Sequence, residues 1–220
     1  MKYLSNPDML LGLMRQMLSG MEVTLPLFFY TLIFSLPLGV IVALMRMCKL
    51  KIVSVPTRVC ILVLRGTPLI LQIFAIYFIL PRLLGHPFDR MASAVVAFVI
   101  NYAAYFAEIY RSGIQSMPVG QYEAAEVLGY TKAQTFVHII LPQVFKRVMP
   151  SITNEVVTLV KDTSMAFTVS YQEMFTIGKQ ISNSEASFVP FLVAGVFYFV
   201  FNAVVDFVMG RIEKRMSYYK

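Results

Sequence analysis

The stretch "VTLPLFFYTLIFSLPLGVIVALM", Val23 to Met45, has no charged side chain. An α-helix needs about 20 such residues to cross the hydrocarbon core of a bilayer. The rest of the chain is of the same kind, because 58% of its 220 residues are hydrophobic and only 14% are charged. Soluble domains carry roughly a quarter charged residues. The sequence therefore predicts an integral membrane protein.

Apolar segments of similar length recur along the chain, and we expect an all-α membrane protein with five transmembrane helices in one domain, residues 1–220. The predicted spans are residues 23–45, 59–80, 91–110, 148–169 and 188–210. Arg65-Gly66-Thr67-Pro68 interrupts the second span, and the fourth contains Glu155, Lys161 and Asp162. Apolar residues at helical spacing over Met9–Leu18 predict an interfacial helix before the first span.

Lysine and arginine residues predict how these spans are oriented. Outside the spans, twelve of them fall on one side of the membrane and five on the other. Because cytoplasmic loops carry the excess of positive charge, we expect the richer side to face the cytoplasm. The N-terminus then lies outside and the C-terminus inside. The net charge of +7 follows from this topology, and no basic stripe indicates nucleic-acid binding.

Neither cysteine nor histidine is placed for a metal or a catalytic site. Cys48 and Cys60 are both predicted near the cytoplasmic face, where we expect free thiols. His86 and His138 are far apart and fall on opposite sides of the membrane, which excludes a zinc site built from both. No His lies within a span, and no Ser–His arrangement indicates an intramembrane enzyme.

A polar segment at residues 113–146 separates the third and fourth spans on the predicted cytoplasmic side. Within it, "EAAEVLGYTKAQTFVHIILPQ" (Glu123 to Gln143) is predicted to form two short helices. Gly129 is placed to end the first helix. Thr131 and Gln134 have the spacing of a capping box for the second, which we expect to end near Pro142. The physical pattern fits either a protein-docking element or an amphipathic connector on the membrane surface.

The same segment resembles the EAA loop of ABC transporter permease subunits. In that family the loop is a coupling helix that docks into a groove of a cytoplasmic ATP-binding subunit. The resemblance implies the type I importer architecture and a docking role for a set of residues in this loop. These residues are Glu123, Ala124, Ala125, Gly129, Leu141 and Pro142.

Three further stretches are similar to permeases for polar amino acids, the class that imports histidine, arginine, glutamine or cystine. They are "RGTPLILQ" (Arg65 to Gln72), "YFAEIYRSGIQSMPVGQYEAAEVLG" (Tyr105 to Gly129) and "LVKDTSMAF" (Leu159 to Phe167). Ser112 departs from the family's usual R-G-G-I, where a glycine is expected. The substitution keeps a small residue at that position.

Ionisable side chains inside a span are costly and are functional-site hypotheses by default. Glu155 and Asp162 are seven residues apart, so they share a helix face with about 10 Å between them along the axis. Two such carboxylates can hold a cationic side chain or an α-amino group, and the resemblance implies that they contact substrate. Lys161 projects about 100° away around the helix. Alternatively, these charges pair with neighbouring helices.

Other polar residues of the spans are candidates for the substrate pathway. Arg65 either meets a substrate carboxylate or an acid of another span, or extends to the interface. Tyr102 of the third span is a further candidate, whereas Glu108 and Arg111 are spaced for a local ion pair. The remaining pathway candidates are Thr67, Gln72, Asn101, Tyr105, Thr158 and Ser164.

The chain has no phosphate-binding G-x-x-x-x-G-K-[ST] loop. If transport is ATP-driven, ATP and Mg²⁺ are therefore bound by a separate ATPase subunit, and this chain is not itself an enzyme. The resemblance implies a prokaryotic plasma (inner) membrane location and four partners besides lipid. They are an ATPase dimer, a second permease subunit, an extracytoplasmic solute-binding protein and an amino acid substrate. The rival hypothesis is a self-sufficient secondary transporter or channel that uses Glu155 and Asp162.

Overall fold

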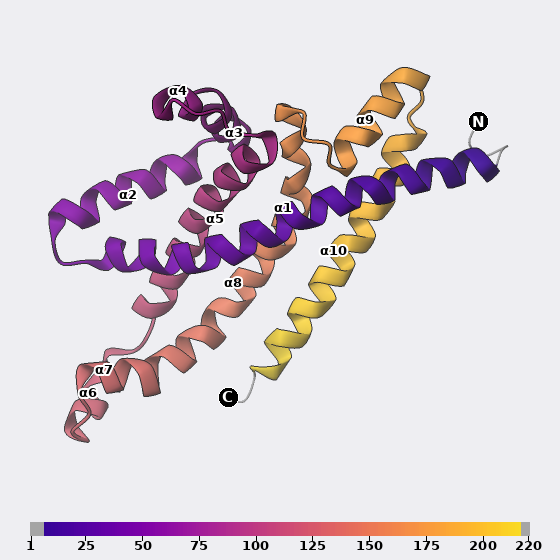
Figure 1. Ribbon diagram of the computed structural model, residues 1–220. Helices are drawn as coiled ribbons and strands as arrows, with labels where there is room; N and C mark the ends of the chain where they lie inside the picture. The colour runs from indigo at the N-terminus through magenta and orange to yellow at the C-terminus, as the bar shows by residue number, and fades with distance from the viewer. Residues whose placement is uncertain (1–6, 217–220) are drawn as a thin grey trace.

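The computed structural model describes residues 7–216, and within this range it is built from helices and their connections (Figure 1). The two termini, whose sides of the membrane were predicted above, lie outside these residues. The α-helices are α1 (Pro7–Met47), α2 (Lys51–Gly66), α3 (Leu69–Phe78), α4 (Leu80–Leu84), α5 (Arg90–Gln115), α6 (Val119–Val127), α7 (Lys132–Gln134), α8 (Leu141–Asp162), α9 (Met174–Glu185) and α10 (Val189–Arg215). A π-helix, η1 (Thr135–Ile140), precedes α8, and a 3₁₀-helix, η2 (Thr163–Val169), follows it.

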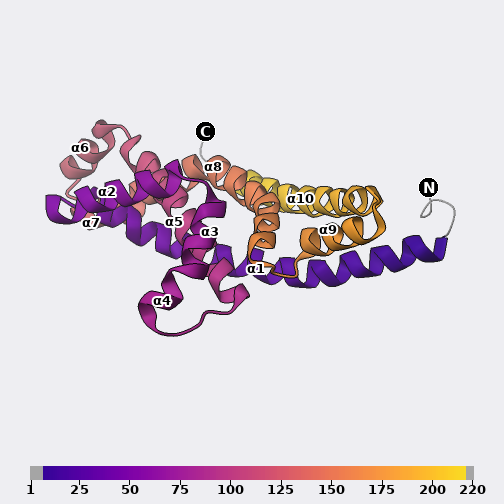
Figure 2. The same cartoon turned by 90° about the horizontal axis from the view of Figure 1, so that it is seen from above.

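Helix α5 lies at the centre of the packing. It packs along α1 and also contacts α2, α3 and α8, while α10 lies beside α8 (Figures 1 and 2). Phe98, Tyr102 and Phe106 of α5 are at most 2% exposed and form the middle of the main hydrophobic core. Since lipid is as apolar as these side chains, close packing rather than removal from water must hold the helices together.

The structure confirms the helical class but not the count of five spans. Within the described residues, α1, α5 and α10 are long and apolar enough to cross a membrane. The predicted second span is divided, because α2 and the helices that follow it meet at 110°. The predicted fourth span corresponds to α8 and η2. Helix α8 is not among the helices that are long and apolar enough to cross a membrane.

The predicted interfacial helix is not a separate element. Met9–Leu18 forms the first turns of α1, which continues without a break to Met47. No proline separates the two segments, so nothing interrupts the backbone hydrogen bonds between them. Pro26 and Pro37 lie inside α1 and do not end it either.

The break between α2 and α3 follows from Pro68. A proline has no backbone N–H, so the carbonyl of Leu64 loses the donor that would sit four residues further along a helix. The side chain of Gln72 replaces it, with Nε2 2.8 Å from the Leu64 oxygen, and Asn101 Nδ2 donates to the same oxygen over 3.2 Å. Asn101 also donates to Gln72 Oε1 over 3.0 Å, and Gln72 donates to Thr67 Oγ1 over 2.9 Å. The break is therefore stabilised by side chains from both α3 and α5.

We predict that Asn101→Ala lowers the free energy of unfolding by about 1–3 kcal/mol, because Gln72 Oε1 loses its donor and the Leu64 carbonyl loses one of its two. The measurement is the apparent melting temperature in detergent, read from size-exclusion profiles after heating. The matched control is Asn154→Ala, at an exposed position of α8, which should leave the melting temperature unchanged. Equal shifts in both variants would show that Asn101 has no special role at the break.

Glycines set the distance between several helices. A Cβ atom on Gly20 of α1 would lie 2.6 Å from the Cα atom of Met174, at the start of α9. Gly39 of α1 is equally close to α5, since its Cβ would lie 2.8 Å from Phe106 Cβ. Small residues of this kind let helix backbones approach closely in a membrane. The position of α9 against α1 therefore depends on a hydrogen atom at residue 20.

We predict that Gly20→Ala destabilises the protein by about 1–3 kcal/mol, as overpacking of a well-packed contact does. Gly12 is the control in the same helix, because a Cβ there meets nothing within 4 Å. Gly12→Ala should be neutral or stabilising by up to about 1 kcal/mol through helix propensity. Thermal melts of both variants in one detergent test this, and a similar loss for both would contradict it.

Candidate functional site

The two candidate acids of the fourth predicted span both lie in α8 and are half-buried. Asp162 is the last residue of the helix and accepts a hydrogen bond from Tyr102, whose Oη lies 2.8 Å from Oδ2. Glu155 is attracted by the positive charge of Arg65, which comes from the end of α2. Asp162 is therefore held by a hydrogen bond from another helix, whereas Glu155 is only attracted across the gap by a charge on another helix.

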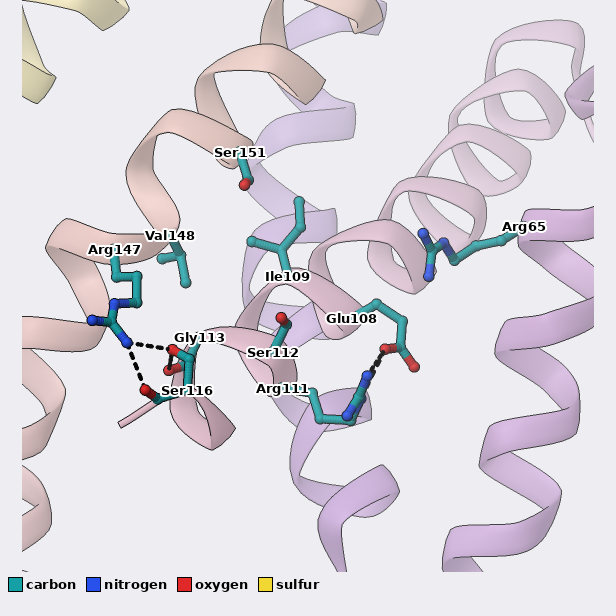
Figure 3. Close-up of a pocket in the computed structure, with 10 residues that line it drawn as sticks. All are labelled: Arg65, Glu108, Ile109, Arg111, Ser112, Gly113, Ser116, Arg147, Val148 and Ser151. Carbon is teal, nitrogen blue, oxygen red and sulfur yellow. Dashed lines mark hydrogen bonds and ion pairs between the residues drawn. The ribbon is translucent and has the colours of Figure 1, made fainter. Parts of the chain in front are cut away.

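Arg65 joins the acid region to two neighbouring cavities. Its guanidinium carbon lies 5.1 Å from the centroid of the Tyr105 ring, a cation–π distance. One cavity, of about 430 Å³, opens between α2, α5 and α8, and Figure 3 shows Arg65 entering it from the opposite side to Arg147. The other, of about 520 Å³, lies between α1, α2 and α5. Arg65 and the Glu108–Arg111 pair line both cavities.

The predicted ion pair between Glu108 and Arg111 is confirmed, with Arg111 Nη2 2.6 Å from Glu108 Oε2 (Figure 3). Arg111 also donates to the side-chain oxygen of Gln115. On the other side of the cavity, Arg147 donates to both oxygens of Ser116, over 2.6 Å to the carbonyl and 2.9 Å to Oγ. The cavity is thus bordered by three arginines: Arg111 is paired with an acid, Arg147 meets neutral acceptors, and Arg65 lies over the Tyr105 ring.

The remaining pathway candidates are distributed over separate places. Gln72, Asn101 and Thr67 take part in the network at the α2–α3 break. Thr158 is half-buried on α8, whereas Lys161 is exposed. Ser164 donates its hydroxyl to the carbonyl of Lys161 over 2.7 Å. The structure therefore brings Glu155, Arg65 and Tyr105 near one another, but it does not join all the candidates into one site.

The polar segment forms the two short helical elements that were predicted. Gly129 follows α6 with φ of +78°, a left-handed conformation that glycine adopts without strain. Thr131 caps α7, and both bonds of the capping box with Gln134 are present. The turn between the elements is therefore specified by local sequence.

The predicted end of the second helix near Pro142 is wrong. The backbone passes from η1 directly into α8, and Pro142 lies in the first turn of α8. In the π-helix the bonding step is five residues, as shown by the bond from the Leu141 amide to the Phe136 carbonyl. Pro142 therefore removes one backbone N–H from a continuous run of helix, and the chain does not end its helix there. Leu141 and Pro142 are half-buried.

The surface of the polar segment is more apolar than its sequence suggests. Val119, Val127 and Leu128 are 69%, 88% and 73% exposed. Glu123 and Ala124 are also exposed, but Ala125 is only 1% exposed and packs inward. Of the two alanines, it is therefore Ala124 that lies on the surface.

Side-chain amides connect α6 to α8. Gln121 and Gln143 exchange two hydrogen bonds, each 2.8 Å long. Gln143 also donates to the Ile139 carbonyl over 2.7 Å. Gly113 lies so close to Val148 that a Cβ would come within 2.2 Å of its Cγ1 atom. The polar segment is therefore tied to the helix that carries Glu155 and Asp162.

Sequence reasoning missed Glu173, a fully buried acid that lies between the predicted fourth and fifth spans. Its carboxyl accepts bonds from the amides of Phe175 and Thr176, the Thr176 hydroxyl and the Tyr198 hydroxyl, over 2.6–2.8 Å. Burial raises the pKa of Glu173, while these bonds favour the charged form. Glu173 is the N-cap of α9, but glutamate is not one of the residues preferred at that position, so the sequence carried no clear signal.

Within residues 7–216, no group of three or more His, Cys, Asp or Glu side chains is placed to hold a metal ion. Cys48 and Cys60 are both free thiols.

Most of the chain matches a known protein family. Residues 35–218 match the family described as "Binding-protein-dependent transport system inner membrane component". The L-cystine transport system permease protein of Bacillus subtilis (strain 168) is 35% identical over 202 residues, covering 91% of this chain and 86% of the relative. The arginine transport system permease protein of the same organism is 32% identical, covering 91% and 92%.

Solved structures of ABC transporters have the same fold as this chain. The crystal structure of an amino acid ABC transporter with histidines has a TM-score of 0.87 and 29% identity, covering 96% of this chain and 98% of that one. An inward-facing methionine ABC transporter has a TM-score of 0.74 at 19% identity, covering 96% and 99%, and shows a shared fold. The chain therefore belongs to the family of binding-protein-dependent transport system inner membrane components and is a permease of the ABC transporter class.

Proposed function

We propose that this permease moves a polar amino acid into the cell by alternating access, driven by ATP hydrolysis on a separate ATPase. Two permease subunits, identical or related, form the pathway, and an extracytoplasmic binding protein delivers the substrate. The N-terminus lies outside and the C-terminus in the cytoplasm. ATP and Mg²⁺ are bound by the partner ATPase pair. The observation that carries this proposal is one helix, α8, that bears two half-buried acids and is tied through Gln143 to the exposed helix α6.

The docking element is α6 with the turn that follows it. Val119, Val127 and Leu128 offer an apolar surface beside Glu123 and Ala124. Exposed apolar patches rimmed by polar groups are typical of protein interaction sites. Docking here would move α6, and the paired amides of Gln121 and Gln143 would carry that movement to α8.

The substrate interaction is assigned to Glu155 and Asp162. In the present arrangement Glu155 is attracted by Arg65, and Asp162 accepts from Tyr102. A substrate ammonium or guanidinium group would compete for the same carboxylates. Relatives named for arginine and for cystine transport support an amino acid substrate, and the two acids favour a cationic one.

We predict that Gly129→Val prevents copurification of the ATPase and abolishes uptake, because valine is strained at φ of +78° and deforms the docking turn. Gly85→Val is the matched control. Gly85 also has a positive φ, of +70°, and a Cβ at either glycine meets nothing within 4 Å. The control should retain the ATPase. A self-sufficient secondary transporter would instead keep its uptake in the Gly129 variant.

We predict that Glu155→Gln and Asp162→Asn each reduce uptake of a basic amino acid by about tenfold or more, the scale of a lost charge-assisted hydrogen bond. ATPase copurification should be unchanged. Asp206→Asn, at an exposed carboxyl of α10, is the control. Uptake in proteoliposomes is measured for arginine and glutamine. If glutamine uptake falls as much as arginine uptake, the acids do not select a cation.

A further inference from the structure

The cavity between α1, α2 and α5 has an excess of positive charge. Its charged lining consists of four arginines and a single acid: Arg46, Arg58, Arg65, Arg111 and Glu108. Glu108 is already paired with Arg111 over 2.6 Å. Three guanidinium groups therefore face a space of about 520 Å³ with no carboxylate left in its lining. An anion is the ligand that such a lining stabilises.

Arg46 supplies a second, independent observation. Its Nε atom is buried and has no hydrogen-bond acceptor among residues 7–216. A buried donor of a charged group without an acceptor is costly, because it has lost water and gained nothing. Arg46 lies in the last turn of α1, where the helix dipole favours a positive charge. The dipole does not, however, supply a hydrogen-bond acceptor for the Nε–H group. A phosphate oxygen in the cavity would provide the missing acceptor if the guanidinium group turned this N–H toward it.

The cavity also has an apolar wall that continues onto the outer surface. Ile61 and Leu62 of α2 line it, and Leu62 is 70% exposed. Val55, Val59 and Val63 of the same helix are 52–53% exposed. A free phosphate ion gains nothing from these side chains. A phospholipid does, since its phosphate is joined through a glycerol group to two acyl chains.

We infer that this cavity binds the phosphate head group of an anionic phospholipid from the cytoplasmic leaflet, with the acyl chains against α2. The inference rests on the proposed orientation, which places Arg46 and Arg58 at the cytoplasmic surface. Anionic lipids are attracted to cations at that surface, and basic pockets between membrane helices bind such head groups. The head group would then lie beside Arg65, which contacts the Tyr105 ring.

The experiment uses the complete permease–ATPase complex in detergent and native mass spectrometry. It is titrated separately with phosphatidylglycerol, phosphatidylcholine and inorganic phosphate. Phosphatidylglycerol should bind, and the other two should not at the same concentration. Arg46→Gln/Arg58→Gln should weaken phosphatidylglycerol binding by about twenty-five-fold, from roughly fivefold for each cation near an anionic head group.

Lys49→Gln/Lys51→Gln is the matched control. It removes the same charge near the α1–α2 connection, but neither lysine lines the cavity, so lipid binding should be unchanged. If the double arginine variant does not elute as a folded complex, Arg58→Gln alone, at an exposed position, is used and should give about fivefold weakening.

Three results would overturn the inference. They are equal binding of phosphatidylcholine, binding of inorganic phosphate as strong as that of the lipid, and equal loss in the lysine control. Uptake by the wild-type complex is measured in parallel. Loss of uptake with lipid binding intact would contradict the proposed function, whereas uptake without specific lipid binding would contradict only this inference.

Discussion

The carbonyl of Leu64 is the group on which the arrangement of this permease depends. Inside a membrane no water is available to an unpaired backbone oxygen, so the break made by Pro68 must be satisfied by protein. Gln72 and Asn101 supply the two donors, one from α3 and one from α5. The 110° turn of the chain at this point places Arg65 at the end of α2, over the ring of Tyr105.

The chemistry of the central region follows from that turn. Arg65 is brought close enough to act on Glu155, and it borders both cavities beside the Glu108–Arg111 pair. On the opposite side of the acid region, Tyr102 holds Asp162. The two acids thus face different helices: Asp162 is bonded to α5, and Glu155 feels the charge of Arg65 at the end of α2. A movement of α2 would change the surroundings of Glu155, and a movement of α5 would change those of Asp162.

Helix α8 connects this region to the surface that is proposed to dock the ATPase. The π-helix leads into α8 without a break, and the amides of Gln121 and Gln143 tie α6 to its first turns. The close approach of Gly113 to Val148 joins the end of α5 to the same helix. These contacts leave little room for α6 to move without α8, which is the mechanical requirement for coupling hydrolysis to transport.

Local sequence by itself determined the helical class, the capping box of Thr131 and Gln134, the turn at Gly129 and the Glu108–Arg111 pair. Each depends on residues within a few positions of one another, so propensity and spacing suffice. The continuation through Pro142 was missed because a π-helix shifts the hydrogen-bond register by one residue, and composition does not show this.

Contacts between distant residues decided the rest. Only the tertiary structure showed that Gln72 and Asn101 donate hydrogen bonds to the Leu64 carbonyl. The same structure showed that Ala125 faces inward and that Glu173 is buried against Tyr198. It also showed that Tyr102, 60 residues away in the chain, holds Asp162. The sequence identified which residues are costly to place in a membrane, but their partners were decided by helix packing, because a buried polar group can be satisfied by any helix that reaches it.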